Sequence, residues 1–136
     1  KSRLRKAFGE WQVASSGLVM FKFVSSPDTA DIRCVWVTDI SELGNAAEAG
    51  QCEFYHDEKG LSRCLMKFVT KPLSTALPLN ADRFHTVCLH EIGHALGLIG
   101  HTANPDDVMF YSVTMKKHRK ISDSEIKRLK KLYSVN

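Results

Sequence analysis

The chain has 136 residues, of which 43% are apolar and 25% are charged, and these globular proportions exclude disordered, collagen-like and coiled-coil proteins. No apolar run approaches the roughly 20 residues needed to cross a bilayer, so we expect one domain with no membrane insertion. The net charge of +4 arises from basic residues at both ends, on predicted helices with apolar opposite faces, which favours solvated helix surfaces over a nucleic-acid site.

The first half of the chain predicts one helix followed by strands. Residues 2–14 carry an apolar stripe with helical spacing, formed by Leu4, Ala7, Phe8 and Trp11. Apolar alternation between turn signals predicts strands over 18–24 and 31–38, and two more over 51–56 and 62–70. Four strands are therefore expected before the next helix.

The four cysteines are too few and too widely spaced for a disulfide scaffold. Cys52 and Cys64 flank a turn signal at 57–60, and a hairpin centred on residue 58 places them nearly opposite each other. A disulfide between them depends on the redox compartment and on Cβ geometry, so both the bonded and the free state stay open. Cys34 and Cys88 occupy apolar positions and are predicted to be buried thiols.

Two further helices are predicted in the second half. Asn80 or Asp82 can cap the first of them, and its pattern continues to a loop over 97–108. The last helix begins at Ser122, whose hydroxyl forms a capping box with Glu125 three residues later.

The second-half helix carries a candidate metal site. His90 and His94 lie four positions apart, so both imidazoles project from one helix face and can share an ion. Glu91 can reach a water on that ion without being a ligand. Gly97 can take the left-handed conformation that ends a helix, and the returning chain brings in His101. Three nitrogens with one open position are typical of a catalytic zinc site.

The remaining histidines match no ligand spacing and are predicted to lie on the surface; they are His56, His85 and His118.

The stretch 84–111 resembles the active-site segment of the metzincin zinc peptidases, whose signature is His-Glu-x-x-His-x-x-Gly-x-x-His followed by a Met-containing turn. Met109 stands at the Met-turn position. The chain is most similar to the matrixins, the matrix-metalloproteinase-like group, and especially to short bacterial-type members, with a weaker resemblance over nearly its whole length. One residue more than in the family pattern separates Gly97 from His101, and Gly100 can absorb it through backbone angles closed to other residues.

The resemblance implies a zincin-like α+β fold in a single catalytic domain, residues 1–136. This fold has a twisted mixed sheet of four to five strands, with an N-terminal helix and an active-site helix packed on it, and a C-terminal helix. The strand that precedes the first helix in the family has no counterpart, so we expect a mature or truncated form. The loop that holds structural calcium and a second zinc has no counterpart between Asp39 and Gly50, so we expect one catalytic zinc alone.

The implied activity is that of a zinc-dependent endopeptidase that hydrolyses internal bonds of extended polypeptides, through a zinc-bound water activated by Glu91. The substrate is a protein or peptide that would pair with the strand 49–55. Met109 is interpreted as an apolar floor under the metal. The predicted walls of the substrate pocket are Phe110, Tyr111 and Val113. We expect a secreted or extracytoplasmic monomer.

Tyr111 has two interpretations. It can be an apolar pocket wall, or, because its spacing from Met109 is similar to that in the astacin and serralysin branches, its phenol can reach the metal and stabilise the oxyanion. Two rival functions also stay open for the chain as a whole. One is a non-catalytic zinc-binding module of the same fold, and the other is a polyanion-binding domain that uses the basic ends.

Overall fold

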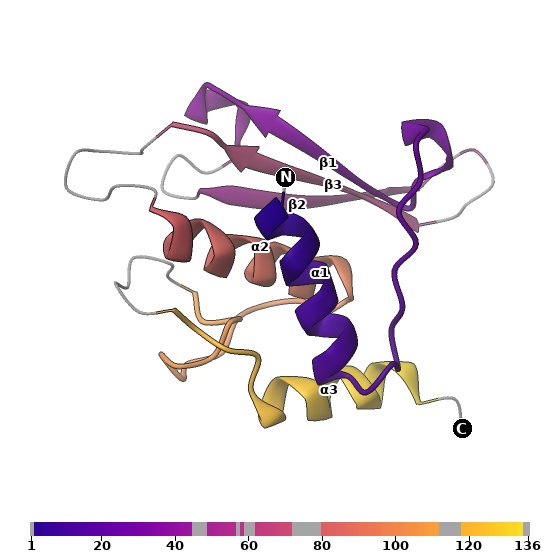
Figure 1. Cartoon of the computed structure of the whole chain (residues 1–136), viewed down its shortest axis with the longest axis vertical. Helices are drawn as coiled ribbons and strands as arrows, with labels where there is room; N and C mark the ends of the chain where they lie inside the picture. The colour runs from indigo at the N-terminus through magenta and orange to yellow at the C-terminus, as the bar shows by residue number, and fades with distance from the viewer. Residues whose placement is uncertain are drawn as a thin grey trace.

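A computed structural model describes residues 2–44, 49–56, 58, 62–71, 80–111 and 118–134 (Figure 1). The elements in chain order are α1 (Ser2–Ala14), η1 (Pro27–Thr29), β1 (Ile32–Val37), η2 (Ile40–Glu42), β2 (Gly50–His56), β3 (Ser62–Val69), α2 (Ala81–Ala95) and α3 (Asp123–Tyr133). The predicted α+β class is confirmed. Within the described segments, no helix is both long enough and apolar enough to cross a membrane.

The described sheet has three strands in the order β1-β3-β2. β3 pairs in parallel with β1 and antiparallel with β2, so the sheet is mixed, as predicted. β2 is therefore an edge strand of the described sheet, and its free edge is the side turned away from β3. The strand count is lower than the predicted four to five.

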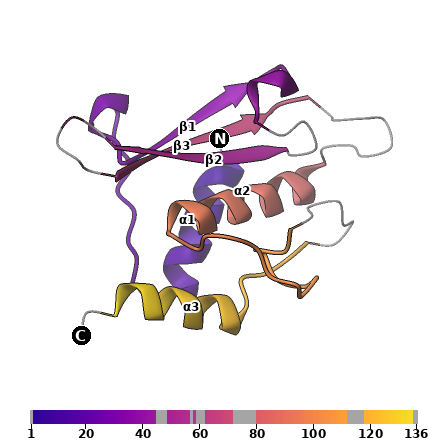
Figure 2. The same cartoon turned by 180° about the vertical axis from the view of Figure 1, so that it is seen from behind.

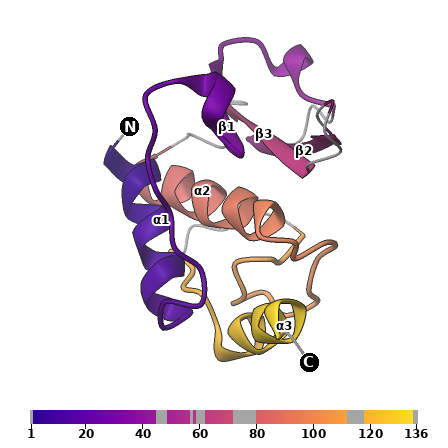
Figure 3. The same cartoon turned by 90° about the vertical axis from the view of Figure 1, so that its right-hand side faces the viewer.

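The predicted strand over 18–24 is wrong. This segment has bends at 18–19 and no regular structure over 20–24. It forms no ladder with the described strands and runs beside α1 (Figure 3). The Phe21 amide donates to the side-chain oxygen of Gln12 at 3.3 Å. The rings of Phe21 and Phe23 meet the Phe8 ring edge to face, with centroids 4.8 and 5.7 Å away. The alternation that predicted a strand therefore reflects packing of side chains against a helix.

Helices and sheet form layers, with α2 beneath the sheet and α3 beneath α2, while α1 lies beside α2 (Figure 3). Met66 and Phe68 of β3 are fully buried between the sheet and the helices. The indole of Trp11 donates to the backbone carbonyl of Leu89 at 2.9 Å, which fixes α1 against the middle of α2. The sheet and α1 thus fix the position of α2 from two sides.

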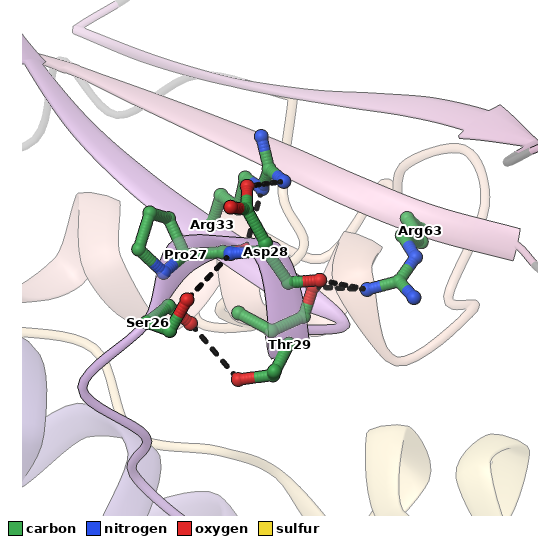
Figure 4. Close-up of polar contacts among 7 residues, drawn as sticks. Ser26, Pro27, Asp28, Thr29, Arg33 and Arg63 are labelled. Carbon is green, nitrogen blue, oxygen red and sulfur yellow. Dashed lines mark hydrogen bonds and ion pairs between the residues drawn. The ribbon is translucent and has the colours of Figure 1, made fainter.

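Arginine side chains fix the chain where it enters β1 (Figure 4). The Arg33 guanidinium donates to the carbonyl of Pro27 at 2.8 Å and pairs with the Asp28 carboxylate at 3.1 Å. Arg63 of β3 donates to the carbonyl of Ala30 at 2.8 Å. The Asp28 pair is solvent-exposed and contributes little by itself, so these contacts mainly set the start of β1 relative to β3.

The hairpin register differs from the predicted one. Cys52 lies opposite Met66, and Cys64 lies opposite Phe54, so the hairpin is centred on residue 59 and the two cysteines are diagonal neighbours. Their sulfur atoms nevertheless lie 2.7 Å apart. The hydrogen bond between the thiols, together with burial, raises the pKa of Cys52. The thiols are free in this structure, and a disulfide stays a prediction.

We expect oxidised protein to contain a Cys52–Cys64 bond, because the two sulfur atoms need to move by less than about 1 Å to reach bonding distance. Burial raises the pKa of both Cys34 and Cys88 to about 12, which keeps these two protonated and unreactive. Peptide mapping under non-reducing conditions should find the Cys52–Cys64 bond. The thiols of Cys34 and Cys88 should react with an alkylating reagent after unfolding. A Cys34–Cys88 bond would contradict the prediction, and Cys64→Ser is the control.

Candidate functional site

α2 begins and ends at residues that set its position. The side chain of Asn80 accepts a hydrogen bond from the Arg83 amide at 2.8 Å, so Asn80 is the cap, and the alternative, Asp82, lies in the first turn. After Ala95 the chain leaves the helix through Gly97, whose φ of +94° is open to glycine and strained for other residues. The chain then turns back beneath α2, where it forms a loop between α2 and α3 (Figure 2).

The three predicted metal ligands meet at the end of α2. The Nε2 atom of His90 lies 3.1 Å from that of His94 and 3.2 Å from that of His101. Gly100, with a φ of +77°, accommodates the extra residue of the motif. Within the described chain, one nitrogen from each ring lies within 4.8 Å of the other two, close enough to share one ion.

Backbone carbonyls orient two of these rings. The Nδ1 atom of His90 lies 2.8 Å from the Val108 carbonyl, and that of His94 lies 3.0 Å from the Leu98 carbonyl. A carbonyl can only accept, so each Nδ1 carries the proton and each Nε2 presents a lone pair. Burial, partly offset by the bond to Val108, lowers the pKa of His90 to about 3, which keeps this ring neutral at neutral pH.

This donor set fits a zinc ion. Neutral imidazole nitrogens are preferred zinc ligands, and their outer nitrogens are held by carbonyls as in known zinc sites. Burial also lowers the pKa of His94. Lone pairs aimed at one point repel each other unless a cation lies between them. The described geometry therefore favours a bound divalent metal ion.

The loop after the third histidine supports the site from below. The Thr102 amide donates to the Met109 carbonyl at 2.9 Å, and Thr102 forms a parallel bridge with Phe110. Met109 is fully buried, and its sulfur occupies the space that a β-carbon on Gly93 would need. Glycine at position 93 thus lets Met109 approach the backbone of α2 between the first two ligands in the sequence.

Glu125 connects this loop to α3, a role that the sequence analysis missed. One carboxylate oxygen accepts from the Met109 amide at 2.6 Å, and the other accepts from the Ser122 amide at 2.7 Å. Glu125 is fully buried. The capping box was predicted, but the bond to Met109 was not, because it joins residues whose contact depends on the tertiary fold.

Glu91 faces the start of β2. It is 5% exposed. A β-carbon added to Gly50 would lie 2.9 Å from its Cγ and 3.1 Å from its Oε1, and 2.7 Å from Val87 Cγ1. Glycine at position 50 therefore allows the edge strand to pass close to the carboxylate. The sequence analysis did not single out Gly50, and no local signal marks it.

Gly50→Ala should lower turnover of the predicted peptidase by roughly 10- to 100-fold. The new methyl group must displace Glu91, the predicted base, or move β2 away from α2, and small misplacements of a reacting group cost that much. Zinc content should not change, since the histidines are untouched. Gly9→Ala is the matched control, because Gly9 lies on α1 with open space where the methyl group would go. Unchanged turnover in Gly50→Ala would show that Glu91 tolerates the shift.

The predicted pocket residues lie just beyond Met109. Phe110 is partly buried, and the Arg119 guanidinium lies 5.0 Å from its ring centroid. Tyr111 is 70% exposed, and its ring packs against Phe110 with centroids 4.4 Å apart. Val113 lies outside the described residues. The described contacts of Tyr111 are thus with an aromatic neighbour.

One of the three other histidines was predicted wrongly. His56 and His118 are exposed, but His85 is 2% exposed, and its Nε2 lies 3.1 Å from the Glu10 carboxylate. The reason is that α2 is covered on most of its sides, by α1 as well as by the sheet, so a polar residue there need not be on a surface.

Comparisons with known proteins agree with this geometry. The chain matches the sequence model of the matrixin family over residues 1–134. It is 28% identical over 151 aligned residues to Metalloendoproteinase 1 of Glycine max, an alignment that covers 100% of this chain and 46% of the relative. The chain thus spans about half the length of this curated relative. No solved structure matches the chain.

Proposed function

The chain belongs to the matrixin family, and from this we propose that it is a zinc-dependent endopeptidase that hydrolyses internal bonds of extended polypeptides. One observation carries the proposal: the Nε2 atoms of His90, His94 and His101 converge at distances of 3.1 and 3.2 Å, beside a buried glutamate. The name of the soybean relative, a metalloendoproteinase, supports the same activity.

Glu91 is the proposed general base. Zinc, when bound, supplies a Lewis acid that polarises the scissile carbonyl and acidifies water. Glu91 accepts the proton of the attacking water and delivers it to the leaving nitrogen. The close approach of Gly50 restricts the positions open to the Glu91 carboxylate, so the proposed base is already oriented before substrate binds.

The free edge of β2 is the proposed substrate-binding surface. It is an edge strand of the described sheet, and its first residue lies beside Glu91. An extended peptide can add to such an edge as a further strand through main-chain hydrogen bonds. The peptide would then pass directly over the three histidines, with Met109 as the floor beneath them and Phe110 as one wall of a side-chain pocket.

We place Tyr111 in that wall and not in the chemistry, because it is 70% exposed and packs on Phe110. Tyr111→Phe should leave kcat within about twofold, since only an unused hydroxyl is lost. A fall in kcat of about tenfold or more with little change in KM would instead show that the hydroxyl stabilises the transition state. Steady-state kinetics on one peptide substrate separates the two results.

Cleavage of a casein-type protein, measured with and without a metal chelator, tests the proposed activity. We expect cleavage by the zinc-loaded chain, loss of cleavage with chelator, and recovery when zinc is restored. Bound zinc without cleavage would support the non-catalytic rival. If the chain neither binds zinc nor cleaves the protein, both zinc-dependent functions are excluded. Only a function that does not use the three histidines then remains.

We also propose that the protein works outside the cytoplasm as a monomer. The 2.7 Å approach of Cys52 and Cys64 supports an oxidising compartment, in which that pair can bond. Size-exclusion chromatography with light scattering tests the oligomeric state.

A further inference from the structure

A second group of side chains that could hold a metal ion lies about one and a half turns before His90 on α2. It contains Glu10 of α1, His85 of α2 and His118 of the segment that leads into α3, and one ligand atom of each lies within 4.8 Å of the other two. The rings of His85 and His118 stack, with centroids 5.3 Å apart and planes 18° apart. Three segments far apart in sequence thus bring two imidazoles and a carboxylate together.

The spacing of these atoms suits a single ion. Ligand atoms of one tetrahedral zinc ion, each about 2.0–2.1 Å from the metal, lie roughly 3.3 Å from each other. The Glu10 Oε1 and His85 Nε2 atoms are 3.1 Å apart, as are the Nε2 atoms of His90 and His94. His118 is exposed, so its ring can turn toward this pair without disturbing the core.

Burial and charge single out the same place. His85 is 2% exposed. Its Nδ1 atom has no hydrogen-bond partner among the described residues, and its Nε2 atom lies 3.1 Å from the Glu10 carboxylate. The same Glu10 oxygen lies 3.8 Å from the ammonium group of Lys6, whose side chain is 67% exposed and free to move away. The carboxylate therefore already attracts a cation, and a metal ion gains nitrogen ligands that an ammonium group cannot use.

We propose that Glu10, His85 and His118 form a second metal site, for a borderline divalent transition metal such as Zn²⁺. Two imidazoles and one carboxylate suit zinc, copper or nickel better than calcium or magnesium, which prefer oxygen ligands. The bound ion ties α1 to α2 and to the segment before α3. From the sequence, one catalytic zinc alone is expected, because the family's ion-holding loop has no counterpart between Asp39 and Gly50. The proposal departs from that expectation with residues outside this loop, and it does not depend on the endopeptidase activity.

The second site is the weaker of the two. His90 and His94 each have a carbonyl at the outer nitrogen, whereas His85 has no such partner among the described residues. Loss of an outer partner typically lowers metal affinity by 10- to 100-fold. We therefore expect the second equivalent of zinc to bind about 10- to 100-fold less tightly than the first.

Titration of the full chain with zinc, followed by calorimetry and metal analysis, tests the proposal. The unmodified chain should bind two equivalents, and saturation of the weaker one should raise the melting temperature. His118→Ala and, independently, Glu10→Gln should each remove the weaker equivalent and its thermal shift while leaving the tighter one. His56→Ala is the matched control, because His56 is an exposed histidine on β2, and it should keep both equivalents.

Two results would overturn the second site: a single equivalent at saturating zinc that His94→Ala removes, or a weaker equivalent that persists in both His118→Ala and Glu10→Gln. The His94→Ala chain separates this proposal from the catalytic one. It should lose the tighter equivalent and keep the weaker. If the unmodified chain binds only the weaker equivalent, the proposed catalytic zinc is wrong and the second site is supported.

Discussion

His101→Ala is expected to lose tightly bound zinc and, with it, all measurable peptidase activity. The Nε2 atom of His101 lies 3.2 Å from that of His90, so its loss leaves two protein ligands where a catalytic zinc needs three. Because His101 is exposed, its removal should not unfold the chain, and the melting temperature of metal-free protein should be little changed. Metal analysis after dialysis, together with the casein assay, measures both effects.

His56→Ala provides the control for this experiment too, since it removes an exposed imidazole from β2. It should retain the zinc. Full zinc occupancy in His101→Ala would mean that the extra residue between Gly97 and His101 has moved the third ligand away from the metal, and that another group completes the site.

Glu91→Gln is expected to lower kcat by about 100-fold or more while zinc stays bound. The amide has nearly the shape of the carboxylate, so it still fits beside Gly50, but it cannot accept a proton near neutral pH. Loss of a general base typically costs 10²- to 10⁴-fold in rate. The histidines are not altered, so metal content and melting temperature should match those of the unmodified chain.

Glu42→Gln is the control, because Glu42 is an exposed glutamate on another element, η2. Its amide oxygen can still accept the hydrogen bond from the Asp39 amide. It should keep full activity. If Glu91→Gln also keeps its activity, another group takes the proton of the attacking water, and the proposed role of Glu91 is wrong.

Local patterns predicted the helices and the principal ligands. All four residues of the apolar stripe in α1 are buried, and α3 begins with the expected capping box. His90 and His94 meet because a helix places residues four apart on one face, which is a property of the backbone alone. Such features depend on neighbours within one or two turns, and the sequence contains those neighbours.

The errors all concern contacts between elements. A turn signal locates a hairpin to within one residue, yet moving its centre from 58 to 59 changes the partner of Cys52 by two positions. His85 was placed on the surface because it matches no ligand spacing, but α1 supplies Glu10 at that point. Neither the register nor the packing partner can be obtained from the spacing of apolar residues.

The contacts that hold the site in position could not be predicted from the sequence either. Gly50 and Glu91 come from different elements, and their approach depends on how close β2 lies to α2. The sequence shows a glycine at a strand end, for which many explanations exist. Only the packing of the two elements shows why a side chain is excluded there.

The hydrogen bond between Met109 and Glu125 spans 16 residues, and this has a consequence for the order of synthesis. A nascent chain that has left the ribosome as far as Met109 already contains Glu91 and all three histidines. It still lacks the carboxylate that fixes the turn beneath them. The ligands are therefore made well before the structure that orients them, and the proposed peptidase becomes competent only when α3 has been added and has folded against the loop.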